Sequence, residues 1–141
     1  MKTDITKPRW APAIALIAIL FGLLTLKSGG LTLFVDGPDR AAAGNYVPFV
    51  LWFNFLAGFV YIIAGLGLFL WRKWAVSLAM VLFVATFVVF MGLGVHIWLG
   101  GLYELRTVQA MILRTSVWMA IAFVVQAAWN RTETGAKQNP E

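Results

Sequence analysis

The chain has 141 residues, of which 61% are hydrophobic and 12% are charged, and its formal net charge is +5. Soluble domains have roughly 45–50% apolar and about 25% charged residues, so this composition excludes a soluble globular domain and predicts an integral membrane protein. The absence of cysteine excludes a disulfide framework, and a single histidine with six acidic residues leaves few catalytic combinations.

The basic residues flank the apolar runs, and four membrane crossings separate them into two groups. Seven lie on the side of the termini, namely Lys2, Lys7, Arg9, Arg72, Lys73, Arg131 and Lys137. Four lie on or toward the other side, namely Lys27, Arg40, Arg106 and Arg114. Because cytoplasmic loops are rich in Lys and Arg, this asymmetry predicts that both termini are cytoplasmic. The basic charge therefore indicates topology, and no nucleic-acid partner is expected.

The first predicted span covers residues 10–27. A cleaved signal peptide is the alternative, but the uncharged run from Trp10 to Leu26 has 17 residues and exceeds the roughly 7–15 typical of such peptides. An outer loop is predicted over residues 28–45, where Gly29-Gly30 indicates a turn before a short apolar piece.

The rest of the chain is predicted to form three more spans and a tail. Two tryptophans bracket the basic pair Arg72-Lys73, as is typical of a cytoplasmic membrane boundary. The predicted segments are a second span over 46–71, a third over 74–99, a fourth over 107–129 and a polar cytoplasmic tail over 130–141. The sequence thus predicts one membrane domain, residues 1–141, with an all-α fold: an antiparallel four-helix transmembrane bundle.

A stripe of small and polar residues follows helical spacing in the second span. Its members are separated by steps of four, three and four, and they are Asn54, Gly58, Tyr61 and Gly65. Residues at such steps share one face of a helix, and small residues let two helices approach closely. We expect this face to pack against another helix, and we favour packing over a ligand site.

His96 belongs to a similar stripe with Ala85 and Gly92 in the third span, which is also expected to face inward. Since it is the only histidine, bis-histidine haem ligation and zinc sites with several histidines are excluded. A mixed site with Met91, Met111 or nearby acids stays open. Scattered methionines are more typical of packed cores, so neither a metal nor a cofactor is expected.

Arg114 lies seven residues into the fourth predicted span, roughly 10 Å along the helix axis. An arginine at this depth is inside the hydrocarbon and is expected to find a partner there. The predicted partners are Glu104, Asp36 and Asp39. We favour an internal ion pair, and an anion, proton or quinone-headgroup site is the alternative.

The two outer loops of the predicted bundle converge on one end, where they are expected to form a polar cap above Arg114. The expected members of this cap are His96, Glu104, Asp36, Asp39 and Arg106. No catalytic residue is predicted. The candidate binding residues are His96, Tyr103, Glu104, Arg114, Asn54 and Asp36.

One longer pattern spans the third connection and the fourth helix. It reads His96-Ile97-x-x-Gly100-Gly101-x-Tyr103-Glu104-x-x-Thr107-Val108-x-Ala110-Met111-x-x-Arg114-Thr115, and it is preceded by Gly44-Asn45-Tyr46-Val47 and by Trp52-x-Asn54-Phe55. From about Gly44 onward the chain resembles a group of small four-span bacterial membrane proteins. This resemblance implies four helices and a multi-pass inner-membrane location, and it implies no activity.

Three classes of function fit these features. The favoured one is a structural or accessory subunit, whose partners are the lipid bilayer and other membrane subunits or further copies of itself. The second is a homo-oligomeric carrier or channel. The third is a ligand-binding or metal-binding membrane protein, or a membrane enzyme, that uses His96, Glu104 and Arg114; we favour a protein without enzymatic activity.

Overall fold

The computed structural model describes residues 6–138, and within this range the protein is entirely helical, with no strand. Four helices are long and apolar enough to cross a membrane, so the chain has the architecture of a small multi-pass membrane protein. The elements are α1 (Ala11–Phe34), the short α2 (Pro38–Ala42), α3 (Pro48–Phe69), α4 (Lys73–Trp98) and α5 (Leu105–Gln138).

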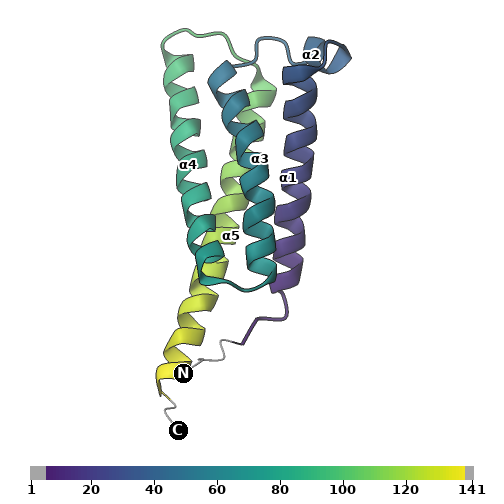
Figure 1. Ribbon diagram of the computed structural model, residues 1–141. Coiled ribbons are helices and arrows are strands. Elements are labelled where there is room, and N and C mark those ends of the chain that lie inside the picture. The colour runs from purple at the N-terminus through teal and green to yellow at the C-terminus, as the bar shows by residue number, and fades with distance from the viewer. Residues whose placement is uncertain (1–5, 139–141) are drawn as a thin grey trace.

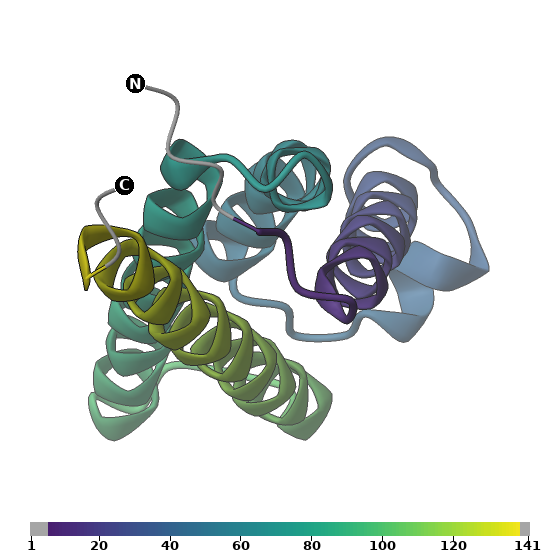
Figure 2. The same ribbon diagram turned by 90° about the horizontal axis from the view of Figure 1, so that it is seen from below.

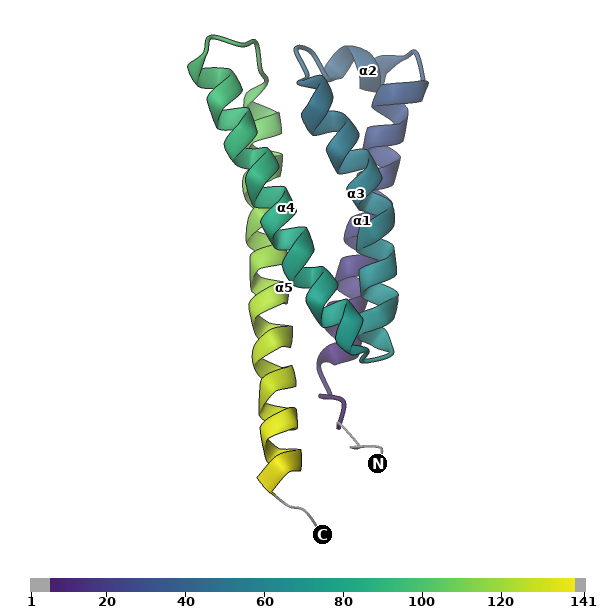
Figure 3. The ribbon, with the colours of Figure 1, turned by 60° about the vertical axis from the view of Figure 1, so that its left-hand side comes forward.

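The long helices lie side by side as two pairs (Figure 1). The start of α1 and the end of α5 lie at one end of the molecule, and α2 lies at the other. α1 packs along α3, and α4 packs along α5. α3 and α4 meet at the short turn that joins them and separate toward the end that carries α2 (Figure 3).

Small residues create the close contact between α1 and α3. The buried residues of α1 recur at steps of three and four, and they are Ala11, Ala15, Ala18, Gly22, Thr25, Gly29 and Thr32. On α3, a Cβ atom at Gly65 would lie only 3.0 Å from the carbonyl oxygen of Ala15, and one at Gly58 would lie 2.9 Å from Leu26. The predicted stripe of Asn54, Gly58, Tyr61 and Gly65 is buried, and its two glycines lie against α1.

Two apolar clusters fill the interior. The larger one joins all four long helices in the half of the molecule that contains the turn between α3 and α4, and its largest side chains include Tyr61, Leu68 and Trp118. The smaller one lies nearer α2 and consists of Val47, Val50, Leu93 and Met111. The outer half of the bundle therefore has the thinner apolar core.

The first helix is longer than its sequence predicted. α1 continues through Gly29-Gly30 to Phe34, where a turn was expected after residue 27. A Cβ atom at Gly29 would lie 3.2 Å from that of Phe55, so this glycine permits close packing against α3 and does not form a turn.

The last helix also exceeds its prediction. α5 begins at Leu105 and continues to Gln138, so the predicted tail is helical through residue 138, and residues 139–141 lie outside the described range. The carboxylate of Glu133 accepts a hydrogen bond from Trp129 Nε1 at 2.9 Å and forms an ion pair with Lys73 at 3.0 Å. These contacts fix the extension of α5 to the start of α4.

The stripe predicted for the third span does not form the buried face of α4. Ala85, Gly92 and His96 are half-buried. The buried residues of this helix are Ala75, Val76, Ala79, Leu82, Thr86 and Leu93. Gly92 lies instead beside Phe49, where a Cβ atom would be 3.6 Å from the ring.

Candidate functional site

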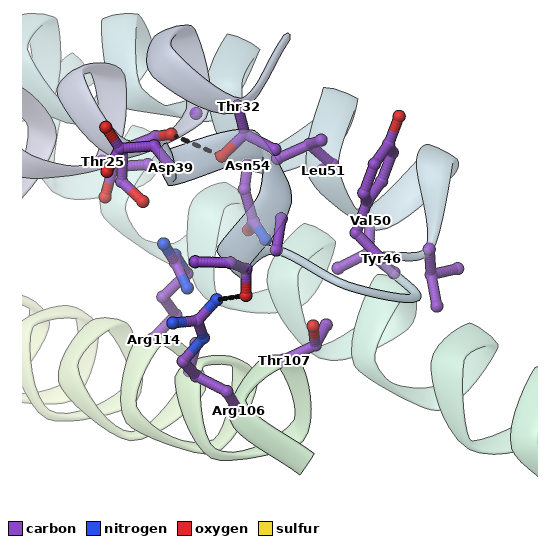
Figure 4. Close-up of a pocket in the computed structure, with 16 residues that line it drawn as sticks. Thr25, Thr32, Asp39, Tyr46, Val50, Leu51, Asn54, Arg106, Thr107 and Arg114 are labelled. Carbon is purple, nitrogen blue, oxygen red and sulfur yellow. Dashed lines mark hydrogen bonds between the residues drawn. The ribbon is translucent and has the colours of Figure 1, made fainter. Parts of the chain in front are cut away.

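A polar cavity of about 270 Å³ lies between α1, α3 and α5 at the end of the molecule that carries α2 (Figure 4). It occupies the region where the two helix pairs separate, beside the smaller apolar cluster. Its position follows from the packing described above, because the small residues of α1 hold that helix against α3 and not against α5.

The α1 wall of the cavity carries Thr25, Ser28, Gly29 and Thr32, which recur at helical spacing on one face. Thr25 and Thr32 are buried. The hydroxyl of Thr32 donates to the carbonyl oxygen of Ser28 at 3.0 Å, within the same helix. Such bonds to the helix backbone let hydroxyl groups sit in an apolar surrounding and still present an oxygen to the cavity.

The α5 wall carries Arg106, Thr107, Ala110 and Arg114. Arg114 lies nine residues after the start of α5, which places it about 13 Å along the helix axis. Its side chain points toward α1 and α3 across the cavity (Figure 4). Within residues 6–138 no hydrogen bond or ion pair joins its guanidinium to another residue, and its Nε is buried without a partner.

The predicted ion pair of Arg114 is therefore not formed with the three acids that were expected to provide it. Glu104 instead accepts a hydrogen bond from the backbone N–H of Asn45 at 2.9 Å. Asp36 pairs with Arg40, and this hydrogen bond raises the pKa of the Arg40 guanidinium above its usual value. Asp39 lines the cavity but lies beyond ion-pair distance of Arg114.

Asn54 lines the cavity from α3 and is 8% exposed. Its Nδ2 donates to Met111 Sδ at 3.5 Å, a long bond to a weak acceptor. Its Oδ1 is buried and has no partner among the residues described. Buried amide oxygens are nearly always paired, so Asn54 and Arg114 together mark this cavity as a polar site with unused hydrogen-bonding capacity.

The loop between α1 and α3 covers the outer end of the cavity. Asp39, Ala42, Ala43 and Tyr46 of this loop belong to the lining. Arg106 donates to the carbonyl oxygen of Ala42, and the bond between Glu104 and the Asn45 amide fixes the same loop a few residues later. Both bonds attach the loop to the start of α5.

Four of the predicted binding residues lie outside the cavity lining. His96 is half-buried with its Nε2 3.0 Å from the carbonyl oxygen of Leu102, so it stabilises the turn after α4. Tyr103 is exposed, and the Asp36 side chain is 91% exposed. Glu104 fixes the loop without lining the cavity. Of the predicted set, Asn54 and Arg114 are the two that the cavity brings together.

Sequence reasoning missed the hydroxyl-bearing wall of α1. The spacing Thr25-x-x-Ser28-x-x-x-Thr32 was visible in the sequence as a helical face. The turn expected at Gly29-Gly30 hid this face, because it placed Ser28 and Thr32 outside the helix.

The charges around the cavity favour an anion. The lining contains two positive charges, on Arg106 and Arg114, and one carboxylate, on Asp39. Its net charge is therefore positive by one unit. Among residues 6–138 no group of three or more His, Asp or Glu side chains is placed to hold a metal ion. The arginines are fixed donors that match the oxygens of phosphate or carboxylate groups.

No family model, no curated protein and no solved structure matches this chain. These comparisons thus identify no family, and the functional interpretation depends on the cavity itself.

Proposed function

We propose that this protein is a multi-pass membrane protein that binds a small anionic group, a phosphate or a carboxylate, in the cavity between α1, α3 and α5. The observation that supports this proposal best is the position of Arg114, which lines the cavity and has no carboxylate within ion-pair distance among residues 6–138.

The energetic argument concerns the cost of an isolated charge. An arginine near the centre of a membrane helix costs about 2.5–3.5 kcal/mol on insertion scales, and such residues normally find a partner. A bound anion would provide that partner for Arg114. The hydroxyls of Thr25 and Thr107 line the same space and can donate further hydrogen bonds to the anion.

The bundle is proposed to be antiparallel with both termini in the cytoplasm of a bacterium, and it would lie in the inner membrane. The excess of Lys and Arg on the side of the termini supports this orientation. The cavity, which lies at the opposite end of the molecule, would then face the outer side of that membrane.

An accessory-subunit role, the function favoured by the sequence alone, remains a second proposal. The large apolar side chains exposed on the long helices suit contact with partner subunits or copies of the chain, but they suit lipid equally. The apolar surface fits both contact with lipid and contact with partner subunits, whereas the polar cavity favours ligand binding over a purely structural role. Ligand binding therefore takes precedence.

Thermal unfolding in a non-ionic detergent tests the proposal. Inorganic phosphate, acetate and a short-chain phosphatidylglycerol are added separately at constant ionic strength to the wild type, Arg114→Gln and Arg40→Gln. Arg40 is the matched control, because it lies on the same end of the molecule but outside the cavity. We expect at least one anion to raise the Tm of the wild type and of Arg40→Gln more than that of Arg114→Gln. Equal responses of all three proteins to every anion would refute the proposal.

A further inference from the structure

The cavity is partly open, with protein on three sides and over its outer end. α3 forms its back wall through Val50 and Asn54, with the smaller apolar cluster behind. The loop that contains α2 lies over its outer end, fixed to α5 by two hydrogen bonds. α1 and α5 form the two facing walls.

The side between α1 and α5 is different. α1 packs along α3 and α5 packs along α4, but the described parts of α1 and α5 do not pack along each other (Figure 2). Ser28, which lines the cavity from α1, is exposed. The cavity is therefore accessible through this gap, which faces sideways in the plane of the membrane.

We infer that the anionic group bound in the cavity is the phosphate headgroup of a membrane lipid, which enters sideways from the bilayer through the gap between α1 and α5. This inference rests on the proposed function and names its ligand class and route. A water-soluble anion would have to pass the loop that Arg106 and Glu104 hold in place, whereas a lipid meets no such barrier.

The order of side chains along the gap matches the order of groups in a lipid. Ser28 and the two arginines provide the polar part. Leu24, one helical turn deeper on α1, is 65% exposed and provides an apolar surface for an acyl chain. On α5, Arg106 and Arg114 are eight residues apart and both line the cavity, so one positive charge lies near its mouth and the other further inside.

The net positive charge of the lining selects among lipids. An anionic headgroup such as phosphatidylglycerol presents its phosphate without an accompanying cation. Phosphatidylcholine would bring its quaternary ammonium group close to Arg106 and Arg114, which repel it. The site should therefore discriminate between these two lipids even though both carry a phosphate.

Native mass spectrometry in a non-ionic detergent tests the inference, with phosphatidylglycerol and phosphatidylcholine of equal chain length titrated separately. We expect the wild type and Arg40→Gln to bind phosphatidylglycerol at least about tenfold more tightly, and Arg114→Gln to lose this preference, because charge-assisted hydrogen bonds to phosphate are removed. Ser28→Trp, which fills the mouth of the gap, should weaken binding. Leu23→Trp is the control for a bulky residue on the same helix, because Leu23 is exposed on a different face of α1 and does not line the cavity.

Each alternative outcome has a distinct meaning. Phosphatidylglycerol binding that persists in both Arg114→Gln and Ser28→Trp would place the lipid on the outer surface of the bundle and overturn the inference. Arg114-dependent binding of inorganic phosphate without a preference for phosphatidylglycerol would also overturn it, but would leave the proposed function standing. If no anion binds in an Arg114-dependent manner, both proposals fail.

Discussion

The rings of Tyr61 on α3 and Trp118 on α5 lie in contact, with centroids 4.8 Å apart and planes inclined by 38°, and both side chains are fully buried. Trp118 lies one turn after Arg114, and both rings belong to the larger apolar cluster. This aromatic contact joins α3 to α5 and thereby links the two helix pairs.

Substitutions at this aromatic pair should separate the contribution of ring burial to stability from that of the Tyr61 hydroxyl. Trp118→Ala removes a fully buried ring and should lower the free energy of unfolding by about 3–5 kcal/mol. Tyr61→Phe should change it by less than about 1 kcal/mol, because the Tyr61 hydroxyl has no partner among residues 6–138. Unfolding in mixed detergent and SDS measures both values. A large loss in Tyr61→Phe would reveal a hydrogen bond to the hydroxyl.

Removal of the cavity's inner charge should stabilise the unliganded protein. Arg114→Met keeps an unbranched side chain and removes a charge that has no ion-pair partner in the described structure, so the free energy of unfolding should rise by about 1 kcal/mol. Thermal unfolding after exhaustive delipidation measures this change. A decrease in Tm would indicate that Arg114 is paired within the folded chain.

Glu104 should act as a hydrogen-bond acceptor and not as a counter-charge for Arg114. Glu104→Gln keeps a side-chain oxygen for the Asn45 N–H, so it should leave the Tm nearly unchanged. Glu104→Ala removes the acceptor and should increase hydrogen exchange at the Asn45 amide by about tenfold. If Gln were as destabilising as Ala, the negative charge itself would be required.

The two glycines with positive φ should differ in their tolerance of a methyl group. Gly44 has a φ of +57°, and a Cβ there would lie 2.9 Å from Cδ of Glu104. Gly100 has a φ of +83° with nothing within 4 Å of that position. Gly100→Ala should cost about 1 kcal/mol of backbone strain, and Gly44→Ala about 2 kcal/mol, because it also displaces the Glu104 carboxylate. Equal losses in thermal stability would contradict this difference.

The proposed orientation predicts the compartment of the C-terminus. Green fluorescent protein fused there should fluoresce, and alkaline phosphatase fused at the same position should be inactive, because both termini are proposed to be cytoplasmic. The reverse pattern would place the cavity on the cytoplasmic side.

The fold was largely predictable because its determinants are local. Apolar runs long enough to span a bilayer, interrupted by Arg72-Lys73 and Gly100-Gly101, predict four helices without reference to tertiary contacts. The ends of α1 and α5 were not predictable in this way. Gly29 serves helix packing against Phe55, and the extension of α5 depends on the contact between Glu133 and Lys73, which is distant in sequence.

The candidate site was predictable only in part. Arg114 stood out because a charge inside an apolar span is conspicuous, and Asn54 stood out through its spacing with glycines. The expected partners of Arg114 could not be predicted in this way, because they depend on how the loop between α1 and α3 folds back over the bundle. The structure directs Glu104 to the Asn45 amide and Asp36 to Arg40, and no local pattern contains that information.

The length of α5 has a mechanical consequence. Its 34 residues extend over about 51 Å, whereas the hydrocarbon core of a bilayer is roughly 30 Å thick. About 20 Å of one uninterrupted helix must therefore stand outside the hydrocarbon, and its polar end from Asn130 to Gln138 accounts for much of this excess. That end therefore lies in the headgroup region or in water, and near its start the exposed ion pair between Glu133 and Lys73 joins it to the beginning of α4.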